Sequence, residues 1–300
     1  MKLLLSLLTF FSFALFSQSI DLSMRLEKNK DYTFYTRSNI EVFEKKKGKV
    51  SKTKLNMNII VNFHVTKVKN DILFCELHYD YFEMNFETKD KNFSIATDRT
   101  FSDDDYTPEG IIGRVFSEMT KHNFYLEIDH KGKILDCTGF EKLFAGAIDG
   151  ITKLPKDVRE NLKEDIQKKY GKESFATNFE LLTQVYPKET VATNDTWENT
   201  NVINSAEIQL NALNHFTLTE IQQDYVLIED KIDYSPILGL EKSAAKKEGQ
   251  GTGTAFYKLN KKTGWIYEGK INQSIKLYDD FKNDPENYLL LLSETTYSDH

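Results

Sequence analysis

The residues best suited to covalent chemistry lie close together near the C-terminal end of the chain. Ser243 and Lys246 have the Ser-x-x-Lys spacing of a serine β-lactamase or penicillin-binding site, and Lys262-Thr263-Gly264 matches a second element of such sites. In those enzymes the serine opens a helix that is distant in sequence from the basic element. Here both lie in one short stretch, so the pattern does not predict catalysis by Ser243.

Two groups of residues consist of side-chain types that can serve as metal ligands. The run Asp103-Asp104-Asp105 with Glu109 offers oxygen ligands for a hard cation, but it lacks the alternating spacing and central glycine of an EF-hand loop. His64 and His78 lie on two strands that are expected to be neighbours, as two zinc ligands would, but no third ligand can be identified. An acidic turn before a helix and two histidines of a sheet are the simpler interpretation. We therefore expect no metal and no cofactor.

Two further patterns are weaker. His130 and Cys137 flank the end of a predicted hairpin and allow a thiol and base pair. Gly249, Gly251 and Gly253 are spaced like glycines of a phosphate-binding loop, yet no helix follows to supply N-terminal amides. Because no convergent set of polar groups can be assembled, we expect the protein not to be an enzyme.

Charge and cysteine content limit the partners. The chain has a formal net charge of −7, and this mildly acidic balance argues against nucleic acid or an anionic lipid surface as a partner. Its two cysteines, Cys75 and Cys137, are too few for a disulfide framework. The sequence leaves open whether they form one bond or remain two buried thiols.

Residues 1–19 have the order of a secretory signal peptide. Lys2 precedes the apolar run 3–16, and small residues follow that suit cleavage after Ser19. The run is shorter than the roughly 20 residues of a membrane-spanning helix, and no later stretch approaches that length. We expect an exported, periplasmic or extracellular protein that does not span a membrane, with residues 20–300 as a single β-rich domain.

The N-terminal third shows the period-two alternation of half-buried antiparallel strands. One face of a predicted strand carries Met57, Ile59, Val61, Phe63 and Val65. The preceding strand runs over 32–44, and 45–54 is expected to be a basic hairpin loop. The following segment, 72–88, is apolar on both faces. One parity carries Leu73, Cys75, Leu77, Tyr79 and Tyr81, and the other carries Ile72, Phe74, Phe82, Met84 and Phe86.

This doubly apolar strand motivates a binding site. One face can pack a core while the other faces a ligand, so we single out as candidate ligand-binding residues Phe74, Phe82, Met84 and Phe86. The alternative is a strand that is sandwiched between two layers and fully buried.

Helical patterns interrupt the strands twice. Thr107-Pro108-Glu109 predicts a capped helix start, and the hairpin that follows turns at 129–132. Residues 139–186 then predict three helices whose apolar stripes include Phe140, Phe144, Ile148, Val158, Leu162, Ile166, Phe175, Phe179 and Leu182. We expect each stripe to cover the sheet.

Strand patterns return after Asn194. One parity of the first strand carries Ile208, Leu210, Ala212, Phe216 and Leu218. A strand at 225–234, a lysine- and glycine-rich loop at 242–253 and a hairpin around 260–264 follow. The whole pattern predicts a mainly β, α+β fold: a large curved antiparallel sheet or half-barrel with one face covered by the three-helix insert.

Three segments resemble an uncharacterised family of exported bacterial β-rich proteins. They are the export signal ending at Phe16-Ser17-Gln18, the turn Ile128-Asp129-x-x-Gly132-Lys133-Ile134, and Pro187 leading through Val191 to Asn194-Asp195-Thr196-Trp197. The resemblance covers most of residues 25–300; it implies the fold and no catalytic residue. The architecture also looks like the half-barrel of periplasmic lipoprotein carriers, which is an analogy of shape.

The favoured interpretation of function is an exported, non-enzymatic binding protein for an apolar or lipid-like ligand held between sheet and helices. The alternative is a cell-envelope module that binds a protein through a sheet edge or the loop 242–253. A hydrolase is a third interpretation, and it requires convergent polar groups that the sequence does not supply.

Overall fold

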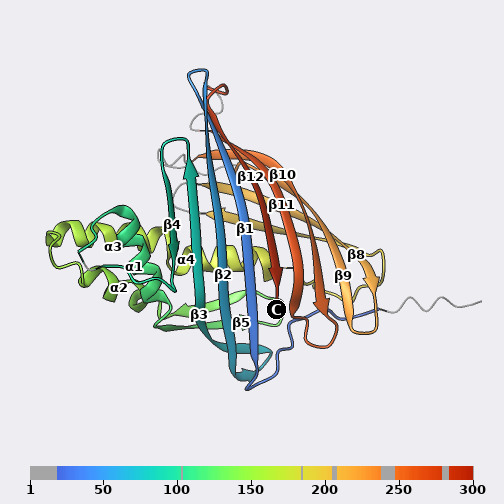
Figure 1. Ribbon diagram of the computed structural model, residues 1–300. Coiled ribbons are helices and arrows are strands. Elements are labelled where there is room, and N and C mark those ends of the chain that lie inside the picture. The colour runs from blue at the N-terminus through green and yellow to red at the C-terminus, as the bar shows by residue number, and fades with distance from the viewer. Residues whose placement is uncertain are drawn as a thin grey trace, which may run out of the picture.

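The computed structural model describes residues 19–102, 104–183, 185–204, 208–237, 247–278 and 284–299. Their strands form one open antiparallel sheet of 12 strands, in the order β6-β5-β3-β2-β1-β12-β11-β10-β9-β8-β7 with β4 paired to β3. The strands are β1 (Asp31–Lys46), β2 (Lys49–Lys69), β3 (Ile72–Thr88), β4 (Asn92–Ala96), β5 (Asn123–Asp129), β6 (Ile134–Thr138), β7 (Thr196–Asn204), β8 (Gln209–Ile221), β9 (Tyr225–Ser235), β10 (Glu248–Asn260), β11 (Ile266–Tyr278) and β12 (Tyr288–Ser298). The helices are α1 (Pro108–Met119), α2 (Phe140–Asp149), α3 (Lys156–Tyr170) and α4 (Lys172–Thr183). The curved sheet is seen in Figure 1, and the predicted fold class is confirmed.

The β1–β2 hairpin is longer than expected. Most of the predicted basic loop is strand, and only Lys47 and Gly48 form the turn, with φ of 51° and 75°. Positive φ at both central residues is typical of a type I′ turn, whose twist matches that of the flanking strands. The hairpin therefore extends as a ribbon beyond the other strands (Figure 1).

A bulge in β3 decides which side chains share a face. Val61 pairs with Tyr79 and Ile60 pairs with Tyr81, so Asp80 is an extra residue in the register. Because strand side chains alternate with period two, one extra residue moves every later side chain to the other face. The buried side chains on both sides of the bulge therefore share one face, and they are Leu73, Cys75, Leu77, Tyr79, Phe82 and Met84.

The bulge separates the four candidate ligand-binding residues, Phe74, Phe82, Met84 and Phe86. Phe74 is half-buried on the outer face, where the Lys67 ammonium lies 4.9 Å from its ring centroid. Phe82 is buried on the inner face against Phe116 of α1, with ring centroids 3.8 Å apart. Met84 and Phe86 lie on the inner face with Phe82, opposite Met57 and Leu55. The expectation that all four side chains share one face is therefore wrong for Phe74, because alternation in sequence does not reveal a bulge.

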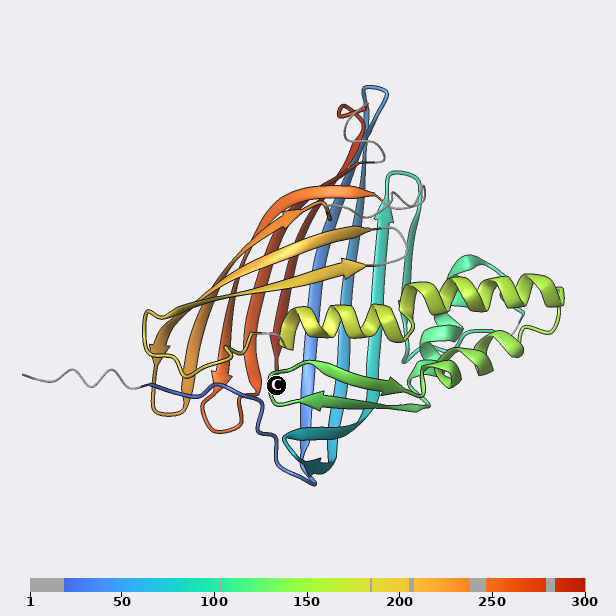
Figure 2. The same ribbon diagram turned by 180° about the vertical axis from the view of Figure 1, so that it is seen from behind.

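Helix α4 provides the cover of the concave face, which we call the inner face. Figure 2 shows α4 crossing this face, while α1, α2 and α3 lie together at the side of β3 and β4. Phe179 of α4 stacks on Phe63 of β2 with ring centroids 5.3 Å apart. Helix α3 packs on α2 and α4, and its Val158 is 42% exposed. The prediction that the apolar stripe of α3 packs against the sheet is therefore wrong for Val158.

The lower end of the inner face, opposite the hairpin tip, is a filled core. Residues 19–30 run across it and hydrogen-bond from Met24 N to the His130 carbonyl and from Arg25 N to the Thr263 carbonyl, each at 2.7 Å. The fully covered side chains in this core include Leu22, Met24, Phe63, Leu77, Phe124 and Trp265. This packing holds the sheet, α4 and the N-terminal segment together.

The turn between β5 and β6 approaches α4 so closely that it requires glycine. Gly132 has φ of 82°, and a Cβ there would overlap the Thr183 carbonyl oxygen. Gly132→Ala is expected to lower the free energy of unfolding by more than about 1 kcal/mol, because a clash is added to the backbone strain. Gly48→Ala is the control, since Gly48 has φ of 75° with open space around it. Urea denaturation compares the two variants, and equal losses would contradict the close approach.

Candidate functional site

The residues that suggested acyl transfer do not form a site in the described part of the chain. Ser243 and Lys246 lie outside the described residues. Lys262-Thr263-Gly264 forms the turn between β10 and β11, where Lys262 Nζ pairs with the Glu27 carboxylate at 2.5 Å. This element is therefore used to anchor the N-terminal segment.

The metal-ligand candidates have other partners. His64 Nδ1 lies 2.7 Å from Asp31 Oδ1, and His78 Nδ1 lies 2.9 Å from Asn123 Oδ1. Asp103 lies outside the described residues. Asp105 accepts a hydrogen bond from Thr107 N, and the Thr107 hydroxyl accepts one from Gly110 N at 3.1 Å, which confirms the predicted helix cap. Within the described residues, no three metal-ligating side chains gather.

The two cysteines are separate buried thiols. Cys75 and Cys137 each pair in register with Leu126, so one strand lies between them. Burial raises the pKa of each thiol to about 12. Because the thiolate is the nucleophilic form, this burial argues against a reactive pair with His130.

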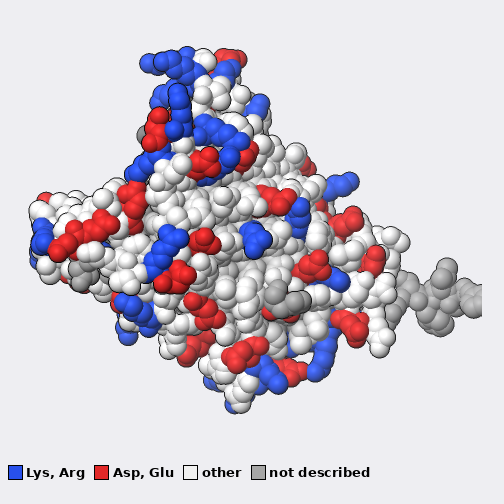
Figure 3. Space-filling model, viewed as in Figure 1, with Lys and Arg blue, Asp and Glu red and all other residues white. Residues whose placement is uncertain are grey.

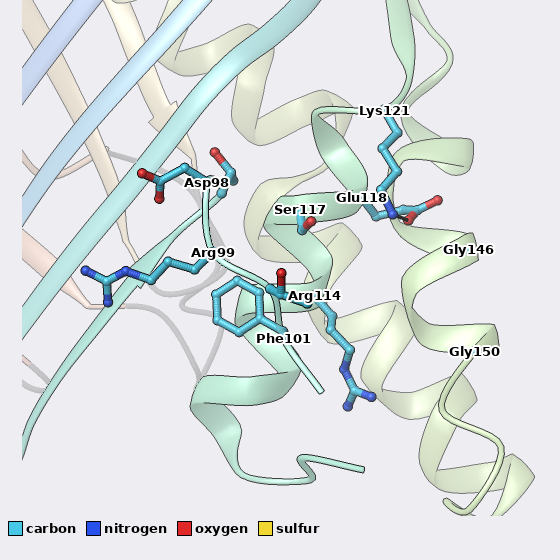
Figure 4. Close-up of a pocket in the computed structure, with 11 residues that line it drawn as sticks. Asp98, Arg99, Phe101, Arg114, Ser117, Glu118, Lys121, Gly146 and Gly150 are labelled. Carbon is cyan, nitrogen blue, oxygen red and sulfur yellow. Dashed lines mark hydrogen bonds and ion pairs between the residues drawn. The ribbon is translucent and has the colours of Figure 1, made fainter. Parts of the chain in front are cut away.

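A polar groove of about 420 Å³ lies between α1, α2 and the chain after β4 (Figure 4). Glu118 pairs with Lys121 at 2.9 Å, and Arg114 donates to the Asp105 carbonyl at 2.8 Å. Ser117 supplies a hydroxyl, but no histidine or cysteine is among the described lining residues. The Glu118, Lys121 and Arg114 side chains of the groove are therefore engaged with one another or with the backbone.

The outer, convex face of the sheet has the character of a solvated surface. Figure 3 shows basic and acidic side chains interspersed over it, with lysines gathered near the β1–β2 tip. Cross-strand ion pairs join Lys52 to Glu41 and Lys270 to Glu294, both at 2.7 Å. The apolar residues of this face, such as Phe43 and Leu290, therefore lie among charged side chains.

On the inner face, the end of the sheet nearest the hairpin tip is apolar and incompletely covered. The register places on this face the half-buried side chains Ile40, Val42, Leu55, Met57, Leu289 and Leu291, which we call the apolar wall. Farther along the same strands, Phe34 and Phe63 are only 6% and 2% exposed. The inner face thus changes from a filled core to an apolar wall along its length.

A band of polar side chains adjoins the apolar wall on the inner face of β7–β9, β11, β12 and β1. This polar band consists of Asn199, Asn201, Asn214, Asp230, Tyr234, Gln273, Ser293, Thr295 and Ser38. Gln273 donates to the Tyr234 hydroxyl at 2.5 Å and accepts from the Ser293 hydroxyl at 2.8 Å. On β12, Ser293 comes two residues after Leu291, so the band begins where the wall ends.

Asp230 is the most unusual member of the polar band. It is 2% exposed, and neither carboxylate oxygen has a hydrogen bond of acceptable geometry among the described residues. Burial raises its pKa to about 7, while the His215 backbone N–H and charge act in the opposite direction. An unpaired buried polar group costs about 1–3 kcal/mol, so its presence requires an explanation.

A glycine of β10 permits a close approach between two strands beside this band. The predicted loop 242–253 is strand from Glu248 onward, while 238–246 lies outside the described residues. A Cβ at Gly251 would overlap the Ser274 carbonyl oxygen and lie 2.7 Å from Ile275 Cα. The glycine therefore permits a close approach of β10 to β11, which is a structural role.

The sequence interpretation missed the polar band, although the alternation contains its signal. In β9, Ile228 and Ile232 are buried on the same parity as Asp230. In β8, Asn214 likewise stands between the buried residues Ala212 and Phe216. Asp230 and Asn214 can each be identified in the sequence as a polar residue at a position where the alternation predicts a buried apolar side chain.

The model of a family of unknown function, DUF6263, matches residues 70–266. The chain belongs to this family. The match to DUF6263 spans β3 to β10 and the motif turns at Gly132 and Asn194, whose φ values are 82° and 73°. A search of the curated proteins found no match.

A solved structure described as "Lipid-protein interactions in lipovitellin" has a TM-score of 0.51 and 10% sequence identity to this DUF6263 protein. The alignment covers 91% of this chain and 25% of that chain, so this chain spans about a quarter of lipovitellin's length. At this identity the similarity shows the fold alone.

Two further solved structures match with TM-scores that are too low to support an argument about the fold. OccK2 (OpdF) of Pseudomonas aeruginosa has 7% identity over 83% of this chain and 65% of its own, with a TM-score of 0.20. The COG4313 outer membrane channel of Pseudomonas putida F1 also has 7% identity and a TM-score of 0.20. That alignment covers 92% of this chain and 97% of the channel's chain. Separately, no helix within the described residues has both the length and the apolar character needed to cross a membrane.

Proposed function

We propose that this protein is a non-enzymatic binding protein that holds an apolar or lipid-like ligand on the inner face of its sheet. The observation that carries the proposal is the apolar wall, whose large side chains lie on the buried side of the sheet and remain half-exposed. Covering apolar surface contributes about 25 cal/mol per Å². A ligand that covers the wall would gain this free energy. On the outer face, by contrast, charged side chains such as Glu41 and Lys52 lie among the apolar residues.

Two further observations support the proposal. Lipovitellin, from a structure described by its lipid-protein interactions, has a similar fold over most of this chain. The order of residues 1–19 predicts export, so the proposed place of action is the periplasm or the extracellular space. The proposal assigns no catalytic residue and no cofactor.

Leu291→Asn is expected to weaken binding of the apolar fluorophore N-phenyl-1-naphthylamine by about tenfold or more, because it places a polar amide in the apolar wall. Leu292→Asn is the matched control: its side chain lies on the outer face opposite Glu41. Fluorescence titration measures the affinity, and circular dichroism establishes that both variants fold. Equal affinities of the two variants, or no binding by the wild type, would contradict the proposal.

A protein-interaction module is the second candidate function. Within the described residues β7 ends the strand order, and Val202 on this strand is 51% exposed. An edge strand can pair with a strand of another chain. If the wild type binds no apolar probe, this second function takes the place of the first.

A further inference from the structure

The unpartnered atoms of the polar band are all hydrogen-bond acceptors. Within the described residues, they are the two carboxylate oxygens of Asp230 and Oδ1 of Asn201, whose residues are 2% and 8% exposed. A carboxylate and an amide oxygen both require a donor. The missing partner is therefore a hydrogen-bond donor.

These acceptors lie along one diagonal of the sheet. Asn214 is opposite Asn199 on β7 and Ile232 on β9, which puts it diagonally between Asn201 and Asp230. Diagonal neighbours on one sheet face are about 7–8 Å apart. A small group at Asp230 therefore has Asn214 as its neighbour, while Asn201 lies one diagonal step farther away. Asn214 is 4% exposed, and its amide makes only long contacts of 3.4 Å to two backbone carbonyls.

The charges near the band disfavour an anionic ligand. Among the described residues of β7–β12, every lysine and histidine on a strand has the outer-face parity, as Lys231, Lys258 and Lys270 illustrate. A phosphate or carboxylate at the band would therefore meet Asp230 without a compensating basic side chain.

The titratable groups around Asp230 do not supply the missing donor. They are His215 on β8, Tyr234 on β9 and Tyr257 on β10, and Tyr257 in turn lies near Tyr297 of β12. The His215 imidazole pairs with Glu198 at 2.9 Å on the outer face. Gln273 donates to the Tyr234 hydroxyl, and neither this hydroxyl nor that of Tyr257 bonds to Asp230.

Building on the proposed function, we propose that the polar band binds the hydrogen-bond-donating end of an amphiphile, an ammonium or hydroxyl group, while the apolar part lies on the apolar wall. Across the sheet, Asp230 is in register with Ala255 of β10, Ile271 of β11 and Thr295 of β12, so at about 4.8 Å per strand it lies about 14 Å from β12. An extended alkyl chain of about 12 carbons has this length, so one molecule can contact both Asp230 and the apolar wall. The band then selects the polar end, and the wall supplies most of the binding free energy.

Competition against bound N-phenyl-1-naphthylamine at about pH 8 tests this inference with dodecylamine, dodecanol and dodecanoate, which share one chain length. Dodecylamine is expected to displace the probe at about tenfold lower concentration than dodecanoate. Asp230→Asn is expected to remove this advantage, while Glu229→Gln, one residue away on the outer face of β9, keeps it. An equal advantage for dodecanol identifies a hydroxyl ligand, and an advantage confined to dodecylamine identifies an ammonium ligand.

The failures of the two proposals are distinguishable. Equal displacement by dodecylamine and dodecanoate, or unchanged selectivity in Asp230→Asn, overturns the inference and leaves apolar binding intact. Absence of probe binding by the wild type overturns the proposed function itself. If Asp230→Asn does not fold, Asn214→Leu removes the amide that lies diagonal to Asp230 and is expected to reduce the dodecylamine advantage; an unchanged advantage overturns the inference.

Discussion

Replacing Phe82 with alanine is expected to lower the free energy of unfolding by about 3–5 kcal/mol. The Phe82 side chain is 7% exposed and packs against Phe116 of α1 with ring centroids 3.8 Å apart. Removing the ring leaves a cavity between β3 and the helix, because a long paired strand can relax only partly. Equilibrium unfolding in urea, followed by circular dichroism, measures the loss.

Phe74→Ala is the matched control on the same strand. Its ring is half-buried on the outer face beneath Lys67, so we expect a loss below about 1.5 kcal/mol. Comparable losses in the two variants would contradict the assignment of faces by the bulge. Apolar probe binding is expected to persist in folded Phe82→Ala, because Phe82 packs against a helix and is not part of the apolar wall.

The β3 strand shows why the sequence predicted the fold better than the site. Alternation correctly predicted a long strand at 72–88, since its residue types suit a pleated, packed surface. The face of each residue depends on Asp80, whose bulge arises from pairing with β2. Pairing is a long-range property, so the even-numbered residues appeared to form a second apolar face that the folded strand does not have.

Local signals were more reliable. The cap at Thr107 and the turn at Gly132 were predicted from residue type, because capping and positive φ depend on a few neighbouring atoms. The glycines of β10 were interpreted as a flexible loop, yet Gly251 lies where two paired strands approach closely. A glycine that is needed for tertiary contact has the same sequence signature as one in a flexible loop.

The polar band required both kinds of information. The parity of Asp230 and Asn214 is visible in sequence as an interruption of two apolar faces. That these interruptions adjoin follows only from the registers of β8 with β7 and β9. A buried acceptor without a partner requires an explanation, and the proposed donor ligand supplies one for Asp230.

Asp230→Asn is expected to stabilise the free protein at about pH 8 and to change its stability little near pH 4. Burial raises the pKa of Asp230 to about 7, above the value of about 4 in an unfolded chain. As the pH rises from about 4 to about 7, the carboxyl ionises in the unfolded state and stays protonated in the folded state. The wild type therefore loses stability over this range, and the loss remains at higher pH.

A shift of this size corresponds to roughly 2–4 kcal/mol once relaxation around the carboxylate is included. Urea unfolding of the wild type, Asp230→Asn and Glu229→Gln at about pH 4 and pH 8 isolates the contribution, because the other titrating groups are nearly the same in all three. The advantage of Asp230→Asn is expected to grow with pH, while Glu229→Gln follows the wild type. If the stability advantage of Asp230→Asn grows with pH, the free protein retains a costly buried acceptor that a donor ligand would satisfy. If the difference does not depend on pH, the carboxylate already has a partner. The band would then have no energetic reason to select a donor.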